Sequence, residues 1–102
     1  MQVVYRLHAI ERMFERKIGE EEVNKILSDG KIIEEYIEDK PYPSKLILGF
    51  VNDWPIHVVA AENIKEEQII VITVYEPSTI IWNDTFERRR KWNVQFVELV
   101  KR

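Results

Sequence analysis

The chain has 102 residues, of which 45% are hydrophobic, and this is enough to bury the core of a single domain spanning residues 1–102. It contains no cysteine, which excludes disulfides and cysteine-ligated zinc and favours a reducing, cytoplasmic location. The formal net charge of −3 argues against a protein that coats nucleic acid non-specifically, because phosphate neutralisation dominates that kind of affinity. No apolar run approaches the ~18 residues of a membrane-spanning helix, so we expect no membrane association.

Two short helices are predicted at the start of the chain. The first covers residues 7–17 and the second begins after Gly19, where three glutamates suit the positive end of a helix dipole, and ends at Gly30. The apolar residues that recur at helical spacing are Leu7, Ile10 and Phe14 in the first helix and Val23, Ile26 and Leu27 in the second. Because the turn between them is short, the two helices form a helical hairpin.

Four strands follow the helices. They are predicted at residues 31–37, 45–51, 56–61 and 68–76. The last strand is a run of Ile and Val up to Thr73, which is typical of a strand covered on both faces, and Pro77 ends it. Thr73 and Tyr75 are two residues apart, so their side chains share one face. The short connections predict an α+β fold in which the helical hairpin packs on a four-stranded antiparallel sheet.

A C-terminal helix is predicted over residues 83–102. The roughly periodic apolar residues are Phe86, Trp92, Phe96, Leu99 and Val100. Residues 92–96 could equally begin as a strand, because their pattern also alternates.

The first helix carries the clearest candidate for chemistry. His8, Arg12 and Arg16 follow one another at intervals of four residues, so they form a stripe nearly opposite the apolar residues. A histidine transfers protons near neutral pH, and arginines bind phosphate oxygens through paired hydrogen bonds. The stripe therefore predicts a site for a phosphodiester. The alternative is a solvated surface on which Glu11 and Glu15 pair with the arginines.

Other polar side chains have less distinctive patterns. The candidate substrate-binding residues outside the first helix are Lys40, Tyr42, Arg88, Arg89 and Arg90. Lys40 and Tyr42 lie in a proline-rich loop, and the three arginines with Lys91 could bind phosphate or an acidic protein. His57 lies inside a strand, which favours a histidine satisfied within the sheet. Two distant histidines without cysteine do not make a metal site, so we expect neither metal nor cofactor.

Three segments together resemble a domain of unknown function grouped with the BrnT and RelE toxins of the barnase–colicin–RelE assemblage of ribonucleases. The matching residues are His8-Ala9-Ile10-Glu11-Arg12-Met13-Phe14-Glu15-Arg16 with Ile18-Gly19-Glu20-Glu21-Glu22-Val23, then Gly30-Lys31-Ile32-Ile33-Glu34, then Val71-Ile72-Thr73-Val74-Tyr75-Glu76-Pro77 followed by Trp82 and Arg88-Arg89-Arg90. Each motif is short, so the resemblance is specific only through the order and spacing of the motifs along the chain.

The resemblance implies a compact toxin that cleaves RNA without metal. It implies catalytic roles for His8, Arg12, Arg16, Thr73 and Tyr75, and it implies a cognate antitoxin as partner, commonly one with a zinc-finger domain like that of the MqsA-like antitoxins. The chain departs from such toxins in charge, since they are usually basic.

The leading hypothesis is therefore a metal-independent endoribonuclease, the toxin of a toxin–antitoxin pair, that cleaves RNA by attack of a 2′-hydroxyl on the adjacent phosphate. The first alternative is a non-catalytic protein-binding module that uses Trp82, Trp92 and the 88–91 cluster, since Trp and Arg are favoured anchors of protein interfaces. The second is a degenerate toxin that keeps the fold without the activity.

Overall fold

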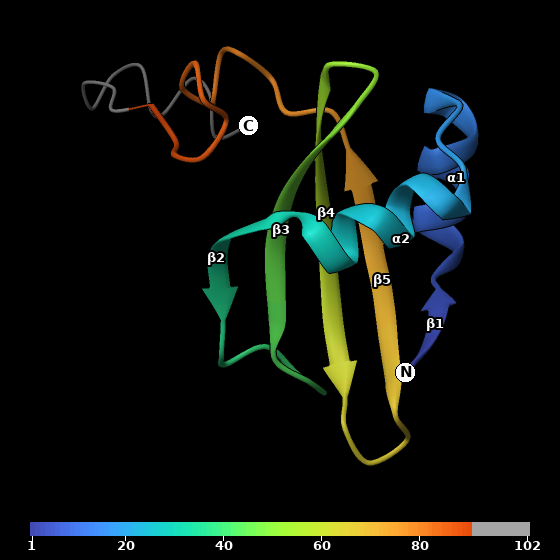
Figure 1. The fold of residues 1–102 in the computed structure, drawn as a ribbon. Coiled ribbons are helices and arrows are strands. Elements are labelled where there is room, and N and C mark those ends of the chain that lie inside the picture. Colours follow the sequence, from blue (N-terminus) through green and yellow to red (C-terminus); the bar gives the residue numbers. More distant parts are fainter. Residues whose placement is uncertain (91–102) are drawn as a thin grey trace.

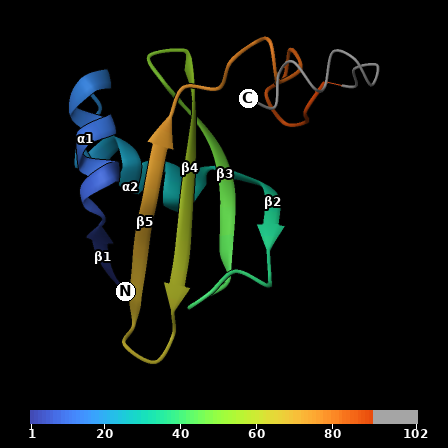
Figure 2. The ribbon, with the colours of Figure 1, turned by 180° about the vertical axis from the view of Figure 1, so that it is seen from behind.

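The computed structural model describes residues 1–90, which form one mixed sheet with two helices on one of its faces (Figures 1 and 2). Along the chain the elements are β1 (Gln2–Tyr5), α1 (Leu7–Arg16), α2 (Glu20–Asp29), β2 (Lys31–Tyr36), β3 (Ser44–Val51), β4 (Trp54–Asn63) and β5 (Gln68–Tyr75). Side chains from both helices join one hydrophobic core with β3, β4 and β5. The α+β class and the two N-terminal helices are as predicted.

The prediction of a four-stranded antiparallel sheet is wrong, because the sheet has a fifth strand and is mixed. The strand order is β1-β5-β4-β3-β2, and β1 pairs in parallel with β5, with Gln2 beside Gln68 and Tyr5 beside Val71. The four remaining strands pair antiparallel in sequence order. A strand of four residues shows no clear alternation, and its partner lies near the other end of the described chain. Local patterns therefore did not reveal β1.

The C-terminal helix does not begin at Asn83 as predicted. Residues 83–90 form turns, and Trp82 makes an isolated bridge with Arg89. The side-chain oxygen of Asn83 accepts hydrogen bonds from the backbone N–H groups of Glu87 and Arg88 at 3.3 and 3.4 Å, which favours a turn over a helix. Residues 91–102, which include the rest of the predicted helix, lie outside the described residues.

Helix α1 buries a different side from the one its apolar pattern predicts. Leu7, Ile10 and Phe14 are 72%, 50% and 85% exposed, whereas Ala9 and Met13 are the buried residues. A small residue such as alanine lets the helix approach the sheet closely, and Met13 then fills the core beside it. The predicted helix is confirmed, but its apolar row faces away from the core.

An irregularity in β5 sorts its side chains between the two faces of the sheet. The pairing register of β4 and β5 leaves Ile72 as an extra residue, so Val71 and Val74 both join the core under the helices. Thr73 and Tyr75, which flank Val74, consequently point to the opposite face, and they share that face as predicted.

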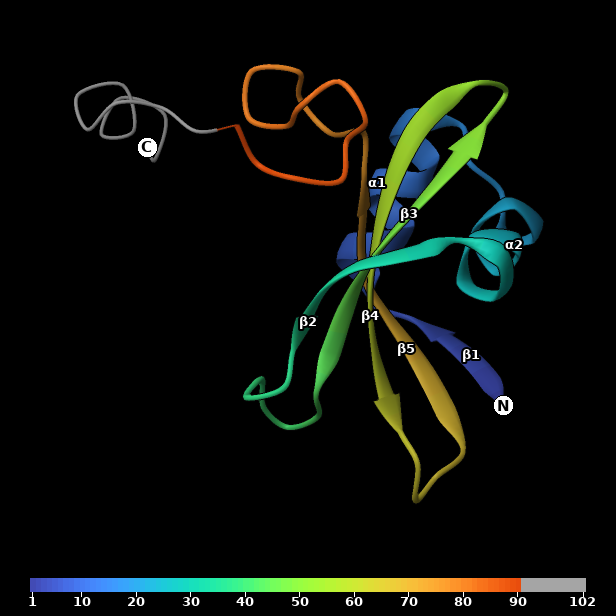
Figure 3. The same cartoon turned by 60° about the vertical axis from the view of Figure 1, so that its left-hand side comes forward.

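The chain continues beyond β5 into a loop, residues 77–90, which we call the capping loop. In Figure 3 this loop lies on the side of the sheet away from α2. Pro77 and Trp82 are buried, and the chain therefore covers part of the face that Tyr75 occupies. Neither helix within residues 1–90 is long and apolar enough to cross a membrane.

Candidate functional site

The predicted stripe on α1 is exposed to solvent along its whole length. His8, Arg12 and Arg16 are all on the surface, and the two arginines form ion pairs. Arg12 binds Glu15 at 3.0 Å, and Arg16 binds Glu76 at 3.3 Å. The stripe is therefore accessible to a large anionic ligand, because exposed ion pairs of this kind contribute little stability and are exchanged readily.

Tyr75 and Thr73 lie on the other face of the sheet from the core that α1 covers. No hydrogen bond or ion pair within residues 1–90 joins either of them to His8, Arg12 or Arg16. The five residues that the resemblance grouped as catalytic are thus divided between two surfaces. Of the three helix residues, Arg16 is linked most directly to Tyr75, because its ion-pair partner Glu76 follows Tyr75 in the chain.

A second constellation of polar side chains surrounds Tyr75, and we call it the sheet-face cluster. Its members are Glu34, Tyr36, His57, Tyr75, Trp82 and Arg89. Strands β2, β4 and β5 supply four of these residues, and the capping loop supplies Trp82 and Arg89. The cluster contains two residues named in the sequence analysis, Tyr75 as a candidate catalytic residue and Arg89 as a candidate substrate-binding residue.

His57 is the centre of the cluster, and its hydrogen bonds determine its tautomer. The side chain is fully buried. Nε2 lies 2.8 Å from the carbonyl oxygen of Phe86, which can only accept, so Nε2 carries the proton. Nδ1 lies 3.1 Å from the Tyr75 hydroxyl and consequently accepts the phenolic hydrogen. The imidazole ring thus connects β5 with the capping loop.

Burial favours the uncharged forms of both His57 and Tyr75. Desolvation lowers the pKa of His57, against the opposing effect of its hydrogen bond to the Phe86 carbonyl. Desolvation also raises the pKa of Tyr75 to about 12. Near neutral pH the pair is therefore a protonated phenol that donates to an uncharged imidazole, and the Tyr75 oxygen keeps its lone pairs for another donor.

A charged group lies beside this neutral pair. Arg89 donates to Glu34 at 2.7 Å, and Tyr36 donates its hydroxyl hydrogen to the same carboxylate. The guanidinium carbon of Arg89 is 4.8 Å from the centre of the Trp82 ring. The Trp82 and His57 rings are nearly perpendicular, with their centres 4.5 Å apart. Burial, followed by the hydrogen bond to Glu34, raises the pKa of Tyr36.

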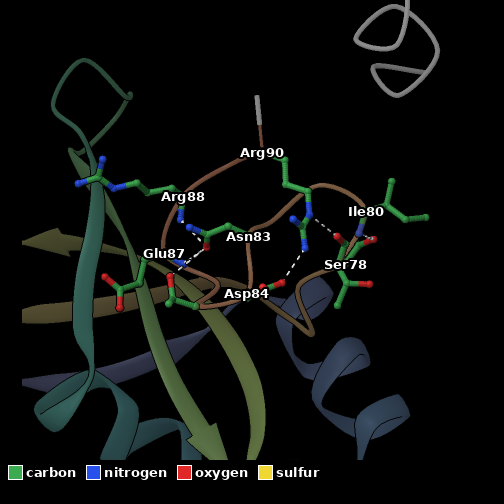
Figure 4. Close-up of polar contacts among 9 residues, drawn as sticks. Ser78, Ile80, Asn83, Asp84, Glu87, Arg88 and Arg90 are labelled. Atoms are coloured by element: carbon green, nitrogen blue, oxygen red, sulfur yellow. Dashed lines mark hydrogen bonds and ion pairs between the residues drawn. The ribbon is translucent and has the colours of Figure 1, made fainter. Parts of the chain in front are cut away.

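The capping loop is held in place by its own polar contacts, several of which Figure 4 shows. The Arg90 side chain donates to the carbonyl of Thr79 at 2.8 Å and to Asp84 at 3.0 Å. Trp82 is only 3% exposed and lies under Arg89. The predicted use of Trp82 as an anchor for a partner protein therefore finds no exposed ring, whereas Trp92 and Lys91 lie outside the described residues.

The remaining predicted residues are dispersed. Arg88 is exposed in the capping loop, and Arg90 is occupied within it. Lys40 and Tyr42 lie in the β2–β3 loop, where the Tyr42 hydroxyl accepts a hydrogen bond from Asn63 at 2.9 Å. Asn63 ends β4 at the far end from His57, so this loop is about 20 Å along the strand from the centre of the cluster.

Sequence reasoning did not find three members of the cluster as functional residues. Glu34 and Tyr36 are two residues apart on β2 and share a face, which is a signal that local alternation could have supplied. His57 was interpreted as satisfied within the sheet, and the structure shows that it is, but through the side chain of Tyr75 and a carbonyl of the capping loop. Within residues 1–90 no group of three or more His, Asp or Glu residues could hold a metal ion.

Comparison with known proteins gives one family. No curated protein and no solved structure matches the chain. A family model described as a domain of unknown function, DUF4258, matches residues 5–76. The matched segment runs from the end of β1 to the residue after β5, and it contains the α1 stripe together with four members of the sheet-face cluster. The chain therefore belongs to the family described as Domain of unknown function (DUF4258).

Proposed function

We propose that this DUF4258 protein is a metal-independent endoribonuclease, the toxin of a toxin–antitoxin pair similar to BrnT and RelE toxins. The observation that carries the proposal is the sheet-face cluster, in which a phenol binds a buried imidazole of fixed tautomer and a guanidinium lies on the Trp82 ring that packs against that imidazole. Such groups serve the two needs of RNA cleavage, which are removal of a proton from the 2′-hydroxyl and stabilisation of charge on the phosphate.

The proton transfer follows from the hydrogen bonds of His57. Tyr75 Oη takes the proton of the 2′-hydroxyl while its own hydrogen passes to His57 Nδ1, so the phenol stays neutral and the imidazole becomes an imidazolium. The 2′-oxygen forms a bond to phosphorus as the bond to the 5′-oxygen breaks. The leaving 5′-oxygen takes a proton from water, and His57 later returns its extra proton to solvent. Glu34 favours the imidazolium electrostatically.

Arg89 is the residue in the cluster that suits the phosphate. Its side chain is about half exposed, and it holds Glu34 through one terminal nitrogen, Nη1. The other donors of a guanidinium remain available to phosphate oxygens, whose charge grows in the transition state. Because the Trp82 ring packs beneath the guanidinium, the direction of the remaining donors is restricted.

The α1 stripe supports the proposal as a surface for the RNA backbone. A phosphate can replace Glu15 on Arg12 or Glu76 on Arg16, since both ion pairs are exposed. The contact between Arg16 and Glu76 lies beside the end of β5, next to Tyr75 in sequence, which suits a strand of RNA that continues from the cluster to the helix. His8 remains the sequence-based candidate for proton transfer on this surface.

Cleavage of a defined RNA by purified protein tests the proposal and separates the two surfaces. We expect Tyr75→Phe and Arg89→Ala each to lower the rate of 2′,3′-cyclic phosphate formation by ~10²-fold or more. Tyr5→Phe is the matched control, because it removes a phenol that binds Asn24 away from the cluster. A substrate with a single 2′-deoxy nucleotide should resist cleavage at that position.

Two results would count against this assignment. Loss of activity in His8→Ala with full activity in Tyr75→Phe would move the chemistry to α1. Intact RNA after incubation with the wild-type chain, together with normal growth of cells that express it, would overturn the ribonuclease proposal itself.

The partner is part of the same proposal. A toxin of this kind requires an antitoxin, and the resemblance supports a small protein with a zinc-finger domain encoded beside the toxin gene. Co-expression of an adjacent open reading frame with paired cysteines at zinc-binding spacing should restore growth. The absence of any such neighbour, with wild-type cleavage intact, would separate the enzyme from the toxin–antitoxin assignment.

A further inference from the structure

The exposed apolar row of α1 has no role in the core or in the proposed site. Leu7, Ile10 and Phe14, which we call the α1 row, are large apolar side chains that are each at least half exposed. Helix α1 lies at the outer edge of the molecule, above β1 (Figures 1 and 2). The intervals between the three residues are three and four, which is the spacing of the seam between two packed helices.

The charged residues beside the row favour a second copy of the same helix. Arg6 is the N-cap residue directly before Leu7, and Glu11 follows Ile10 within the helix, so their charges lie beside the two ends of the Leu7–Ile10 part of such a seam. Neither side chain forms an ion pair with any residue of the described part of the chain, unlike Arg12 and Arg16. Both charges are therefore available to another molecule.

The direction of pairing follows from these charges. In a parallel helix pair the residue before the first seam position faces the residue five places later on the partner, which sets Arg6 against Glu11 twice about a two-fold axis. In an antiparallel pair the two copies of Glu11 would face each other. We propose that two copies of this chain associate through their α1 rows in parallel, with reciprocal Arg6–Glu11 contacts.

The size of the seam sets the expected affinity. A helix of ten residues with three seam positions is smaller than the interfaces of about 1,200–2,000 Å² that hold stable complexes. The dimer should therefore be weak, with a dissociation constant on the order of 100 μM. The His8, Arg12 and Arg16 stripe lies on another side of the helix and stays exposed in this arrangement, so the inference does not depend on the proposed function.

Sedimentation equilibrium of the full chain over concentrations from about 10 μM to about 1 mM tests the dimer around the expected dissociation constant. The wild type should shift from monomer to dimer across this range. Phe14→Glu should stay monomeric, and its fold should be intact by circular dichroism because Phe14 is exposed. Ile64→Glu is the matched control, since Ile64 is an exposed isoleucine in the β4–β5 connection, and it should dimerise like the wild type.

A charge exchange tests the parallel arrangement. Arg6→Glu and Glu11→Arg should each weaken the dimer by several-fold, and the double variant should restore it, because the pair is then reversed rather than removed. Three outcomes would overturn the proposal. The first is a wild type that is monomeric at every concentration, as expected if another protein covers the α1 row. The second is a Phe14→Glu variant that still dimerises, as expected for association through the β1 edge. The third is a double variant that dimerises no more tightly than either single variant.

Discussion

Replacing His57 by alanine should loosen the capping loop and lower the free energy of unfolding by roughly 3 kcal/mol. The imidazole is fully buried and partners the Tyr75 hydroxyl and the Phe86 carbonyl. Each unpartnered buried group costs about 1–3 kcal/mol, and the lower end applies here because water can reach the vacated position. Loss of the edge contact with Trp82 adds about 0.5–1.5 kcal/mol. This is a large share of the ~5–15 kcal/mol that stabilises a domain.

Denaturation in urea, followed by tryptophan fluorescence, measures this loss. Trp82 should become more solvated when its neighbour His57 is removed, so the native-state emission should shift to longer wavelength before global unfolding. His57→Gln is the matched variant, because its amide can still donate and accept, and it should lose less stability than alanine. A change below about 0.5 kcal/mol in His57→Ala, with unchanged emission, would refute the account of His57 as the link between β5 and the loop.

The same residue predicts a dependence of stability on pH. Burial lowers the pKa of His57 in the folded chain below the ordinary value of 6.5, so the unfolded chain binds a proton first as the pH falls. Stability therefore rises with pH through this region, is fully present above pH 6.5, and is lost as the pH falls below 6.5 toward the folded pKa. The neighbouring charges, Glu34 and Arg89, oppose each other in this shift. The stability of the His57→Gln variant should not fall as the pH is lowered from 6.5 to the range where carboxylates begin to titrate, because glutamine does not titrate.

Three further substitutions test the packing of the helices. Gly49→Val should destabilise the fold by about 1–3 kcal/mol, because a Cβ at Gly49 would clash with the Ile26 side chain on α2. Thermal denaturation should therefore show a lower midpoint. An unchanged midpoint would contradict the close approach of α2 to β3. Met13→Ala should cost about 2–5 kcal/mol, whereas Phe14→Ala should change stability by less than about 0.5 kcal/mol, because Met13 is buried and Phe14 is exposed. The reverse order in chemical denaturation would restore the original prediction that Phe14 faces the core.

The two helices show which features can be predicted from residues close together in the sequence. The glycine and the glutamates that open α2 are close to it in sequence, and the helix begins at Glu20 as they indicate. For α1 the same reasoning found the helix but not its buried side. Ala9 and Met13 face the sheet and join the core together with Val71 and Val74 of β5. That choice depends on β5, which lies some sixty residues away in the chain.

The candidate site shows a similar division. The alternation in β5 predicted correctly that Thr73 and Tyr75 share a face. It could not indicate that this face is opposite to α1, because the extra residue Ile72 shifts the alternation within the strand. The contact of Tyr75 with His57 arises from the pairing of two antiparallel strands, and the approach of Arg89 depends on the turns of the capping loop.

Within residues 1–90, the sequence by itself determined the elements whose signals are local: the two N-terminal helices, the second of which ends just before Gly30, and four of the five strands. The tertiary structure alone decided the parallel pairing of β1, the buried side of α1, and the convergence of β2, β4, β5 and the capping loop on one buried imidazole. The physical reason is that propensity and periodicity act between residues a few positions apart, whereas the choice of face and partner is made by contacts between segments far apart in the chain.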